Sequence, residues 1–308
     1  MIYTVTLNPA LDRTIEVEKL VDEDTIRIIT ETSYAGGKGI DVSRVVRALG
    51  GKSVALGYIG GYDGLKLEGL LINAGVVTDF TRIGGETRTN IIIKEREADR
   101  QFVISAAGPE ISCAEVGALY QRLLELRGME YLVVSGSLPR GVTSNFYGQI
   151  ILAGKKNDAF VMLDADGRTL KESIEYLPTC IKPNRFELSR LVGRDLQTES
   201  ELLAACDQLH EKGIPFVLLS RGKDGLVLST PERKFKGMAP PVEVGSAVGA
   251  GDSSVGGFVL ARSRGEDLEG CLRLACAAGT ATAMAPGTEL ASLEAVEKLL
   301  PRVMISEL

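Results

Sequence analysis

Short, continuously apolar segments recur along this chain and constrain its fold more than any other feature. They lie at residues 2–7, 54–59, 131–134, 160–163, 216–219 and 225–228. A strand with one face in water alternates apolar and polar residues, so continuous apolar runs are typical of strands that are covered on both faces. The chain is therefore expected to build a sheet that lies inside the molecule.

Helical patterns occupy the intervals between these segments. In residues 39–49, Val42, Val45, Val46 and Leu49 lie at i, i+3, i+4 and i+7, which indicates one apolar helix face. Similar patterns occur at residues 113–126, 145–155, 199–212 and 268–284. Strands that alternate with helices predict a doubly wound α/β fold, with a mostly parallel sheet and helices on both faces.

Two stretches, at residues 12–34 and 86–105, alternate charged and β-branched residues instead. Alternation with period two indicates a sheet with one covered face. We expect the two stretches to pair into a small β-sheet, too thin to be stable alone, that covers the core as a lid or packs against another subunit. The chain would then be one α/β domain over residues 1–308, with this lid inserted in it.

Charge and hydropathy exclude several kinds of partner. The 35 basic and 41 acidic residues give a formal net charge of -6, which disfavours an extensive nucleic-acid surface. No apolar run reaches the roughly 18 residues needed to span a bilayer. The N-terminal residues also lack the basic start and apolar stretch of a signal peptide. We expect a cytoplasmic protein without nucleic-acid or membrane partners.

The cysteine and histidine content argues against metal sites and histidine catalysis. The five cysteines form no C-x-x-C pair and resemble scattered small apolar residues, and Cys271 and Cys276 are expected on a buried helix. The single histidine, His210, is expected to be exposed on a helix without a functional role. Sites built on histidine triads or histidine-bound metals are therefore disfavoured.

The most specific motif is V-G-S-A-V-G-A-G-D-S at residues 244–253, followed by an apolar helix at 255–261. Gly249 and Gly251 allow a sharp turn into a helix start, where free N–H groups and the helix dipole can bind an anion, typically a phosphate. Asp252 could instead be only an N-cap, and the motif alone leaves both interpretations open. The chain has no Walker A loop, no protein-kinase signature and no G-x-G-x-x-G after its first strand.

Five further motifs accompany it: T-L-N-P-A-L-D at 6–12, A-G-G-K-G-I at 35–40, T-R-T-N at 87–90, S-G-S-L-P at 135–139 and I-K-P-N-R-F-E-L at 181–188. Taken in chain order, from residue 6 to residue 253, the six motifs resemble those of the ribokinase-like carbohydrate kinases. The similarity is to the phosphofructokinase-B branch, which includes 1-phosphofructokinases, tagatose-6-phosphate kinases and the minor type of 6-phosphofructokinase.

The resemblance implies a ribokinase-like fold and ATP-dependent phosphorylation of a ketohexose phosphate, first of all fructose 1-phosphate to fructose 1,6-bisphosphate. Tagatose 6-phosphate and fructose 6-phosphate remain open as substrates. Arg88 and Ser137 argue against an unphosphorylated sugar or nucleoside, and the presence of Asp252 argues against a catalytically silent sugar-phosphate sensor. ATP and Mg²⁺ are the expected cofactors.

Within that resemblance, Asp252 would be the base that takes the proton from the substrate hydroxyl. The amides of Gly249, Ala250 and Gly251 would bind the transferred phosphoryl group. Asn184 and Glu187 would lie near the ATP phosphates, with Mg²⁺ held by Glu187 largely through water. The alternative for this pair is a polar helix N-terminus.

The nucleotide groove would be lined by Lys182 and by residues 219–225, with Ser220, Gly222 and Gly225 as the named contacts. The alternative for residues 219–225 is a tight turn between strands, and both interpretations can hold because glycines also allow close approach of a ligand. Gly279 would pass close to the adenine.

The sugar site would contain Asp12, which can accept hydrogen bonds from two sugar hydroxyls, together with Asn90. Gly36, Gly37 and Lys38 open a helix whose N-terminus favours a polar or anionic ligand. Arg88 and Arg27 would clamp the sugar phosphate from the two lid stretches, with solvated arginines as the alternative. Ser137 would contact the same phosphate.

Asp41 departs from the family pattern, because relatives usually carry asparagine there. Asparagine donates and accepts hydrogen bonds, whereas an ionised aspartate only accepts. The change places the identity of the sugar in question. Finally, pairing of two lid sheets would protect their exposed edges, so a homodimer is expected.

Overall fold

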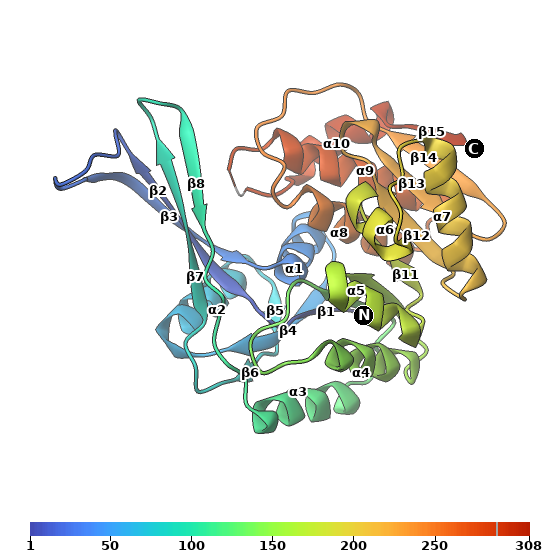
Figure 1. Ribbon diagram of the computed structural model, residues 1–308, viewed down its shortest axis with the longest axis horizontal. Helices are drawn as coiled ribbons and strands as arrows, with labels where there is room; N and C mark the ends of the chain where they lie inside the picture. Colours follow the sequence, from blue (N-terminus) through green and yellow to red (C-terminus); the bar gives the residue numbers. More distant parts are fainter. Residues whose placement is uncertain (288) are drawn as a thin grey trace.

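A large, mostly parallel β-sheet forms the centre of the computed structural model, which describes residues 1–287 and 289–308 (Figure 1). Its strands are β1 (Ile2–Thr6), β4 (Ser53–Ile59), β5 (Val77–Thr78), β6 (Thr81–Arg82), β9 (Tyr131–Ser135), β10 (Phe160–Asp164), β11 (Cys180–Ile181), β12 (Phe216–Ser220), β13 (Leu226–Ser229), β14 (Lys234–Met238) and β15 (Met304–Glu307). Their order is β15-β14-β13-β12-β11-β10-β9-β1-β4-β5, and β6 also pairs with β4. The pairs from β5 to β12 are parallel, while β13, β14 and β15 add an antiparallel edge.

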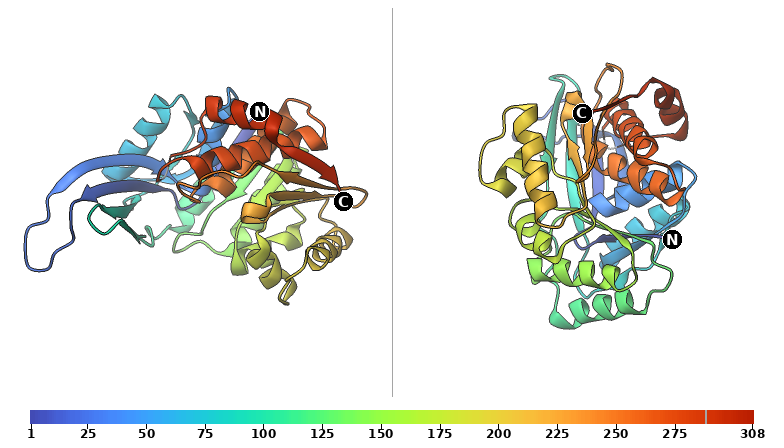
Figure 2. Two further views of the ribbon diagram at one scale, coloured as in Figure 1. Left: turned by 90° about the horizontal axis from the view of Figure 1, so that it is seen from above. Right: turned by 90° about the vertical axis from the view of Figure 1, so that its right-hand side faces the viewer.

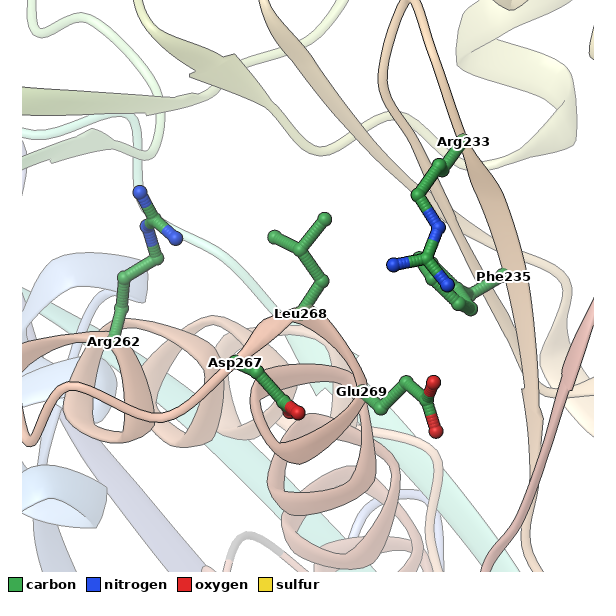
Figure 3. Close-up of a pocket in the computed structure, with 6 residues that line it drawn as sticks. All are labelled: Arg233, Phe235, Arg262, Asp267, Leu268 and Glu269. Carbon is green, nitrogen blue, oxygen red and sulfur yellow. The ribbon is translucent and has the colours of Figure 1, made fainter.

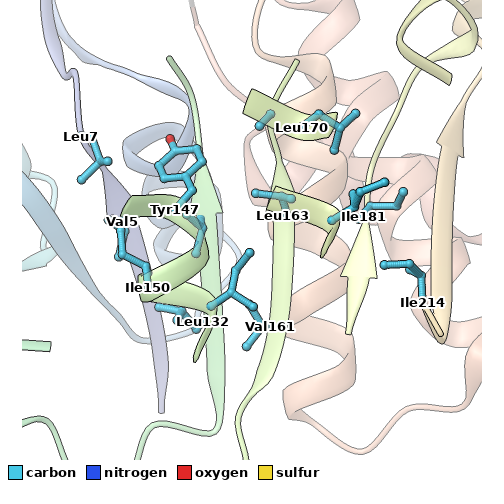
Figure 4. Packing of buried hydrophobic residues seen from close by; sticks show 14 of the residues in the cluster. Val5, Leu7, Leu132, Tyr147, Ile150, Val161, Leu163, Leu170, Ile181 and Ile214 are labelled. Carbon is cyan, nitrogen blue, oxygen red and sulfur yellow. The ribbon is translucent and has the colours of Figure 1, made fainter. Parts of the chain in front are cut away.

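Helices cover both faces of this sheet (Figure 2). They are α1 (Lys38–Ala48), α2 (Gly61–Asn73), α3 (Cys113–Glu125), α4 (Ser144–Lys155), α5 (Gly167–Ser173), α6 (Arg185–Val192), α7 (Glu199–Glu211), α8 (Ala250–Ser263), α9 (Leu268–Met284) and α10 (Leu293–Leu299), with short 3-10 turns η1 (Ile174–Tyr176), η2 (Gly222–Asp224) and η3 (Leu300–Arg302). Helices α3 to α7 share one apolar cluster with the sheet, part of which is shown in Figure 4. Helices α1, α8, α9 and α10 share the cluster on the opposite face. The predicted doubly wound α/β fold is confirmed.

A second sheet of four strands stands beside the core and projects from it (Figure 1). It consists of β2 (Ala10–Val17), β3 (Ile28–Gly36), β7 (Arg88–Glu95) and β8 (Arg100–Ile104), in the order β3-β2-β7-β8. The two alternating stretches of the sequence do pair into one small sheet, as predicted. We call it the lid sheet, and its function as a lid remains a prediction.

Several details differ from the sequence-based expectations. The strand β11 and the edge strands β14 and β15 were not predicted, because β11 has only two residues and the edge strands are short and contain charged residues. The expected exposure of His210 is wrong: its ring is half-buried and its two nitrogens lie 2.7 Å from the Ile214 carbonyl oxygen and 2.8 Å from the Ser229 hydroxyl. Cys271 and Cys276 are buried on α9, as predicted. No helix within residues 1–287 and 289–308 is long and apolar enough to cross a membrane.

Candidate active site

The carboxyl ends of four neighbouring parallel strands place polar side chains on one face of the central sheet. Thr6 ends β1, Ser135 ends β9 and Asp164 ends β10, and the three residues lie side by side in the sheet register. Lys182 directly follows β11. The residue before each of these four belongs to the apolar cluster under α3 to α7. Because successive strand residues point to opposite faces, the four polar residues face α1 and α8.

The N-terminus of α8 lies above this row. Gly249 precedes the helix in the left-handed conformation, with a φ of 77°, which a residue with a side chain rarely adopts. The amide of Ala250 lies at a long 3.4 Å from the carbonyl oxygen of Ala247. The amides of Gly249 and Gly251 have no acceptor in the part of the chain that the structure describes. These amides are available to an anion, and Asp252 follows them in the first turn of the helix.

Two lysines converge on Asp164 below this helix terminus. The ammonium nitrogen of Lys38 lies 3.0 Å from Oδ1 of Asp164, and that of Lys182 lies 3.5 Å from the same oxygen. The Asp164 side chain is 1% exposed and that of Lys182 6% exposed. A Cβ built on Gly251 would lie 3.4 Å from the Lys182 ammonium, so the lysine reaches the α8 terminus. The arrangement is a cationic floor under free backbone amides, which suits a polyphosphate.

Asp164 was missed by the sequence analysis. The signal was available, because ligands of open α/β sheets bind outside the carboxyl ends of the strands and Asp164 directly follows the apolar run 160–163. An acidic residue at that position was not distinguished from a polar loop residue.

The charges around Asp252 disfavour its ionisation. Burial raises the pKa of Asp252 well above its usual range, and the negative charges of Asp164 and Asp41 raise it further. Lys38 and Lys182 oppose this shift. In turn, burial lowers the pKa of Lys38, but the charges of Asp164 and Asp252 outweigh it and the net shift is upward. An aspartate with a raised pKa beside cations is suited to accept a proton.

A second group of polar residues forms where the lid sheet meets α1. The side chain of Asn90 donates a hydrogen bond of 2.8 Å to Oδ1 of Asp12. Gly36 ends β3 so close to the Asp12 carboxylate that any side chain at position 36 would clash with it. Burial raises the pKa of Asp12, and the hydrogen bond from Asn90 and the charges of Arg88 and Arg44 oppose the rise.

Asp41 lies in the first turn of α1 and belongs to the same group. Its amide donates a hydrogen bond of 2.9 Å to the carbonyl oxygen of Gly37, the residue that precedes the helix. Its Oδ1 accepts a hydrogen bond of 2.9 Å from Arg44. Burial raises the pKa of Asp41 to about 7; the charge of Arg44 lowers it and the charge of Asp12 adds to the rise.

Arg88 begins β7 beside these residues, but part of its hydrogen-bonding capacity is already used. Its guanidinium donates to the backbone oxygen of Asn8 at 2.9 and 3.2 Å and to that of Ala106 at 2.9 Å. Ser137 is exposed and accepts a long hydrogen bond of 3.4 Å from the side chain of Asn8. Arg88 and Ser137 are thus linked through Asn8, as residues of one phosphate site would be.

The expected clamp between Arg27 and Arg88 is wrong within a single chain. Arg88 pairs with Ala10 at one end of β2, whereas Arg27 directly precedes Ile28, which pairs with Val17 at the other end. Seven residues of strand separate the two ends, or about 23 Å. One phosphate cannot contact both arginines of the same chain.

Three further candidates, Asn184, Glu187 and Ser220, lie where α6 begins and β12 ends. Asn184 and Glu187 form a capping box at the start of α6, with the Glu187 amide donating to Asn184 at 2.9 Å and the Asn184 amide donating to Oε2 of Glu187 at 2.8 Å. Ser220, at the end of β12, forms a bridge with Asn184. The helix-terminus alternative for Asn184 and Glu187 is correct, and their contact with nucleotide phosphates stays a prediction.

Three glycines that were expected to contact the nucleotide also have structural roles. Gly222 and Gly225 lie in the η2 turn between the antiparallel strands β12 and β13, so the strand-turn alternative holds. Gly279, on α9, lets this helix approach α8, since a Cβ there would clash with the hydroxyl of Ser254. Whether any of the three approaches a nucleotide remains a prediction.

No group of three or more His, Cys, Asp or Glu that could hold a metal ion occurs in residues 1–287 and 289–308. Glu187 nevertheless fits a Mg²⁺ site that is shared with the substrate phosphates. Its Oε1 has no hydrogen-bond partner among the described residues, and its negative charge contributes to the raised pKa of Lys38. A hard cation bound by one carboxylate, water and substrate phosphates needs no protein cage.

Two surface cavities lie away from these residues. One of about 200 Å³ is lined by Arg233, Phe235, Arg262, Asp267, Leu268 and Glu269 (Figure 3). The other shares Arg262 and lies against the starts of β9 and β10, at the opposite ends of the strands from Asp164. None of the candidate residues lines either cavity.

Comparisons with known proteins show the family of the chain. A family model described as "pfkB family carbohydrate kinase" matches residues 5–295. The chain is 34% identical to the 1-phosphofructokinase of Bacillus subtilis over 308 residues, covering 100% of both chains. It is 33% identical over 309 residues to the D-tagatose-1-phosphate kinase of Bacillus licheniformis, again over 100% of both. The solved structure of phosphofructokinase-2 from Escherichia coli in complex with potassium superposes with a TM-score of 0.93 at 31% identity, covering 97% of this chain and 98% of that one.

Proposed function

The chain belongs to the pfkB family of carbohydrate kinases, and from this premise we propose that it transfers the γ-phosphoryl group of ATP to a ketohexose 1-phosphate, with fructose 1-phosphate as the first candidate. The proposal is supported by three groups that lie together: Asp252, the free amides at the N-terminus of α8, and the two lysines that contact Asp164. D-Tagatose 1-phosphate is the next candidate, because the relative from Bacillus licheniformis is named for it. Ketohexose 6-phosphates, fructose 6-phosphate and tagatose 6-phosphate, remain further candidates.

In the proposed reaction, Asp252 takes the proton of the sugar hydroxyl as that oxygen attacks the γ-phosphorus. The raised pKa of Asp252 makes its carboxylate a stronger base than an exposed aspartate. The bond between the γ-phosphorus and the β,γ-bridging oxygen breaks, and ADP leaves with the electron pair. The products are a ketohexose bisphosphate and ADP.

The charge that develops on the phosphoryl oxygens would be stabilised by groups already in position. The amides of Gly249 and Gly251 point to the N-terminal side of α8, and Lys38 and Lys182 lie below it. Preorganised donors of this kind each contribute on the order of 3 kcal/mol to the transition state. Mg²⁺, when bound with ATP, would neutralise charge on the phosphates, and Glu187 would hold it.

The sugar would lie between the lid sheet and α1. Asp12 would accept from its hydroxyls, with Asn90 holding the carboxylate in place. Arg88 would bind the phosphate at the far end of the sugar with the N–H groups that Asn8 and Ala106 leave free.

We further propose that the protein is a cytoplasmic homodimer that associates through its lid sheets. The lid sheet exposes large apolar side chains on β3 and β8, such as Ile28 at 50%, Val103 at 59% and Ile104 at 55%. Apolar strand faces and edges of this kind need a cover. Because of its position, Arg27 can serve sugar-phosphate binding only from a second subunit. Sedimentation of the purified protein as a monomer at assay concentration would contradict the dimer.

The activity is tested by measuring ADP formation with Mg²⁺ and ATP for fructose 1-phosphate, tagatose 1-phosphate, fructose 6-phosphate, tagatose 6-phosphate, fructose and ribose. We expect a ketohexose 1-phosphate to have the highest kcat/KM. Preference for a 6-phosphate would keep the reaction class and change the substrate. Turnover restricted to fructose or ribose would exclude the phosphate site at Arg88.

A further inference from the structure

The hydroxyl of Thr282 makes its contacts outside its own helix. Thr282 lies in the last turn of α9, and its side chain is completely buried. A hydroxyl within a helix can donate to a carbonyl oxygen one turn back, as that of Ser254 on α8 does to Ala250 at 3.0 Å. The Thr282 hydroxyl instead lies 2.6 Å from Oγ of Ser253 and accepts a hydrogen bond of 2.8 Å from the Ala291 amide. It therefore joins three segments of the chain at one point.

Ser253 connects this point to the start of α8. It directly follows Asp252, and its side chain is completely buried as well. Its amide donates a hydrogen bond of 2.8 Å to the carbonyl oxygen of Gly249. Ser253 is thus bonded to the helix terminus through its amide and to α9 through its hydroxyl, so that a shift of Ser253 would move the residues around it.

Thr282 also supports Gly249 from the side. A Cβ built on Gly249 would lie 3.6 Å from the methyl carbon of Thr282 and 2.7 Å from Cδ2 of Leu290. These two side chains therefore fill the space beside the left-handed Gly249. Leu290 is in turn the neighbour of Ala291, whose amide is bonded to the Thr282 hydroxyl.

The chain that leads into the α8 terminus is bonded to the same end of α9. The amides of Gly245 and Ser246 both donate to the carbonyl oxygen of Ala283, at 2.9 and 3.2 Å. The turn between Ser246 and Ser253 is thus held at its two ends by adjacent residues of α9. At the first end the bonds are between backbone atoms, whereas at the second the bond depends on the side chain of Thr282.

We propose that Thr282 is a positioning residue for phosphoryl transfer, because its hydroxyl holds Ser253 and thereby fixes the free amides and the base at the start of α8. Thr282 itself has no surface that a substrate could reach. A displacement of about 1 Å at reacting groups can cost on the order of 10²-fold in rate, so a contact behind the site can affect the reaction. The inference rests on the proposed function, because it takes the α8 terminus to bind the transferred phosphoryl group.

The test compares Thr282→Val, which has a similar shape but no hydroxyl, with Thr282→Ser, which keeps the hydroxyl. The matched control is Thr230→Val, because the buried Thr230 hydroxyl also has two partners, donating to the carbonyl oxygen of Arg233 at 2.9 Å and accepting from its amide at 3.0 Å. Thr230 follows Ser229, which pairs with the start of β12 and so lies away from the site. The readouts are kcat, both KM values and unfolding in urea, with the sugar phosphate that the wild type prefers.

We expect kcat of Thr282→Val to fall about tenfold while the sugar KM stays within about twofold of wild type. Thr282→Ser should keep kcat within about threefold of wild type, and Thr230→Val should lose stability without losing kcat. A kcat of Thr282→Val within threefold of wild type would overturn the inference. The same kcat loss in Thr282→Ser or in Thr230→Val would overturn it too, because the loss would then not depend on the hydroxyl at position 282.

Inhibition by fluoroaluminate gives a readout that a purely structural role of Thr282 would not change. In the presence of ADP and the sugar phosphate this planar anion takes the place of the phosphoryl group in transfer, so its inhibition constant reports on the donors at the α8 terminus. We expect the inhibition constant to rise about tenfold in Thr282→Val, while the dissociation constant of ADP stays within about twofold. An unchanged inhibition constant would overturn the inference.

Ser253→Ala opens the same pair of hydroxyls from the other side, and it keeps the inference testable if Thr282→Val does not fold. We expect Ser253→Ala to show the same selective loss of kcat. The double variant should lose no more than the larger single loss, because both changes break one contact. Losses that multiply would overturn the inference alone, since wild-type turnover would be unaffected. Absence of wild-type turnover for every sugar would overturn the proposed function and the inference with it.

Discussion

The ammonium nitrogen of Lys38 lies 3.0 Å from Oδ1 of Asp164, and this ion pair joins the start of α1 to the end of β10, 126 residues further along the sequence. The ammonium nitrogen of Lys182, directly after β11, lies 3.5 Å from the same oxygen. One buried carboxylate thus holds two cations at the site where the phosphates are proposed to bind, and the three residues depend on one another.

Replacing Asp164 with asparagine should therefore destabilise the fold, because the Lys182 ammonium would be left buried without a charged partner. We expect the free energy of unfolding to fall by about 3 kcal/mol. Urea unfolding of the purified variant measures this loss. Asp79→Asn, which breaks a more exposed pair with Arg122, should cost less than about 1 kcal/mol. Equal losses in the two variants would show that Asp164 does not hold the lysines.

Arg88→Lys keeps the charge and removes the planar fork of donors. We expect the KM for the sugar phosphate to rise about tenfold, because lysine cannot make a bidentate contact with a phosphate. Steady-state kinetics with fructose 1-phosphate and, as a control, with unphosphorylated fructose separates two roles. If KM changes equally for both sugars, Arg88 acts only through its bonds to the carbonyl oxygens of Asn8 and Ala106.

Gly279→Ala should destabilise the protein, because the new methyl group would overlap the Ser254 hydroxyl where α9 crosses α8. Overpacking of this kind costs about 1–3 kcal/mol. Removing the hydroxyl removes the shortest contact, and the Ser254 Cβ would then lie 3.5 Å and the Ala250 carbonyl oxygen 3.1 Å from the added carbon. The double variant Gly279→Ala with Ser254→Ala should therefore recover part of the lost stability in thermal unfolding. Failure to recover would mean that Gly279 is required for another reason.

The central fold was predictable because local pattern and tertiary environment agree. The apolar runs at 2–7, 131–134 and 160–163 became β1, β9 and β10 almost to the residue, since a strand buried on both faces is mostly apolar. The two alternating stretches likewise identified the lid sheet. The short strand β11 was not predictable, because two residues carry no periodicity and its position is fixed by pairing with β10 and β12.

The site was predicted in part. The motif around Asp252 and the contacts near Asp12 depend on local sequence and were found, whereas the role of Asp164 depends on which strand ends meet and was not. The pairing of Arg27 with Arg88 failed for the same reason, because strand register decides which ends of two strands are neighbours. Sequence spacing alone shows neither which strand ends are neighbours nor the register in which two strands pair.

Asp41 should make stability depend on pH in a defined direction. Its pKa is raised from 3.8 to about 7 in the folded state, so the folded protein holds this proton more tightly than the unfolded chain does. The contribution of Asp41 to the free energy of unfolding therefore falls as pH rises from about 4 to about 7. Asp41→Asn should be more stable than wild type at pH 8 by at least about 1 kcal/mol, and the difference should be clearly smaller at pH 4.5. Urea unfolding at the two pH values measures this, and a variant that is less stable than wild type at pH 8 would contradict the assigned direction.

The role of Asp252 as the base is tested most directly by the kcat of Asp252→Asn, measured with saturating ATP and the preferred sugar phosphate, alongside the dissociation constant of that sugar phosphate. An asparagine of similar shape cannot take the hydroxyl proton. We predict that kcat falls by at least about 10²-fold while the dissociation constant changes by less than about threefold. A kcat within tenfold of wild type would contradict the account, because the proton would then have to leave the sugar by another route.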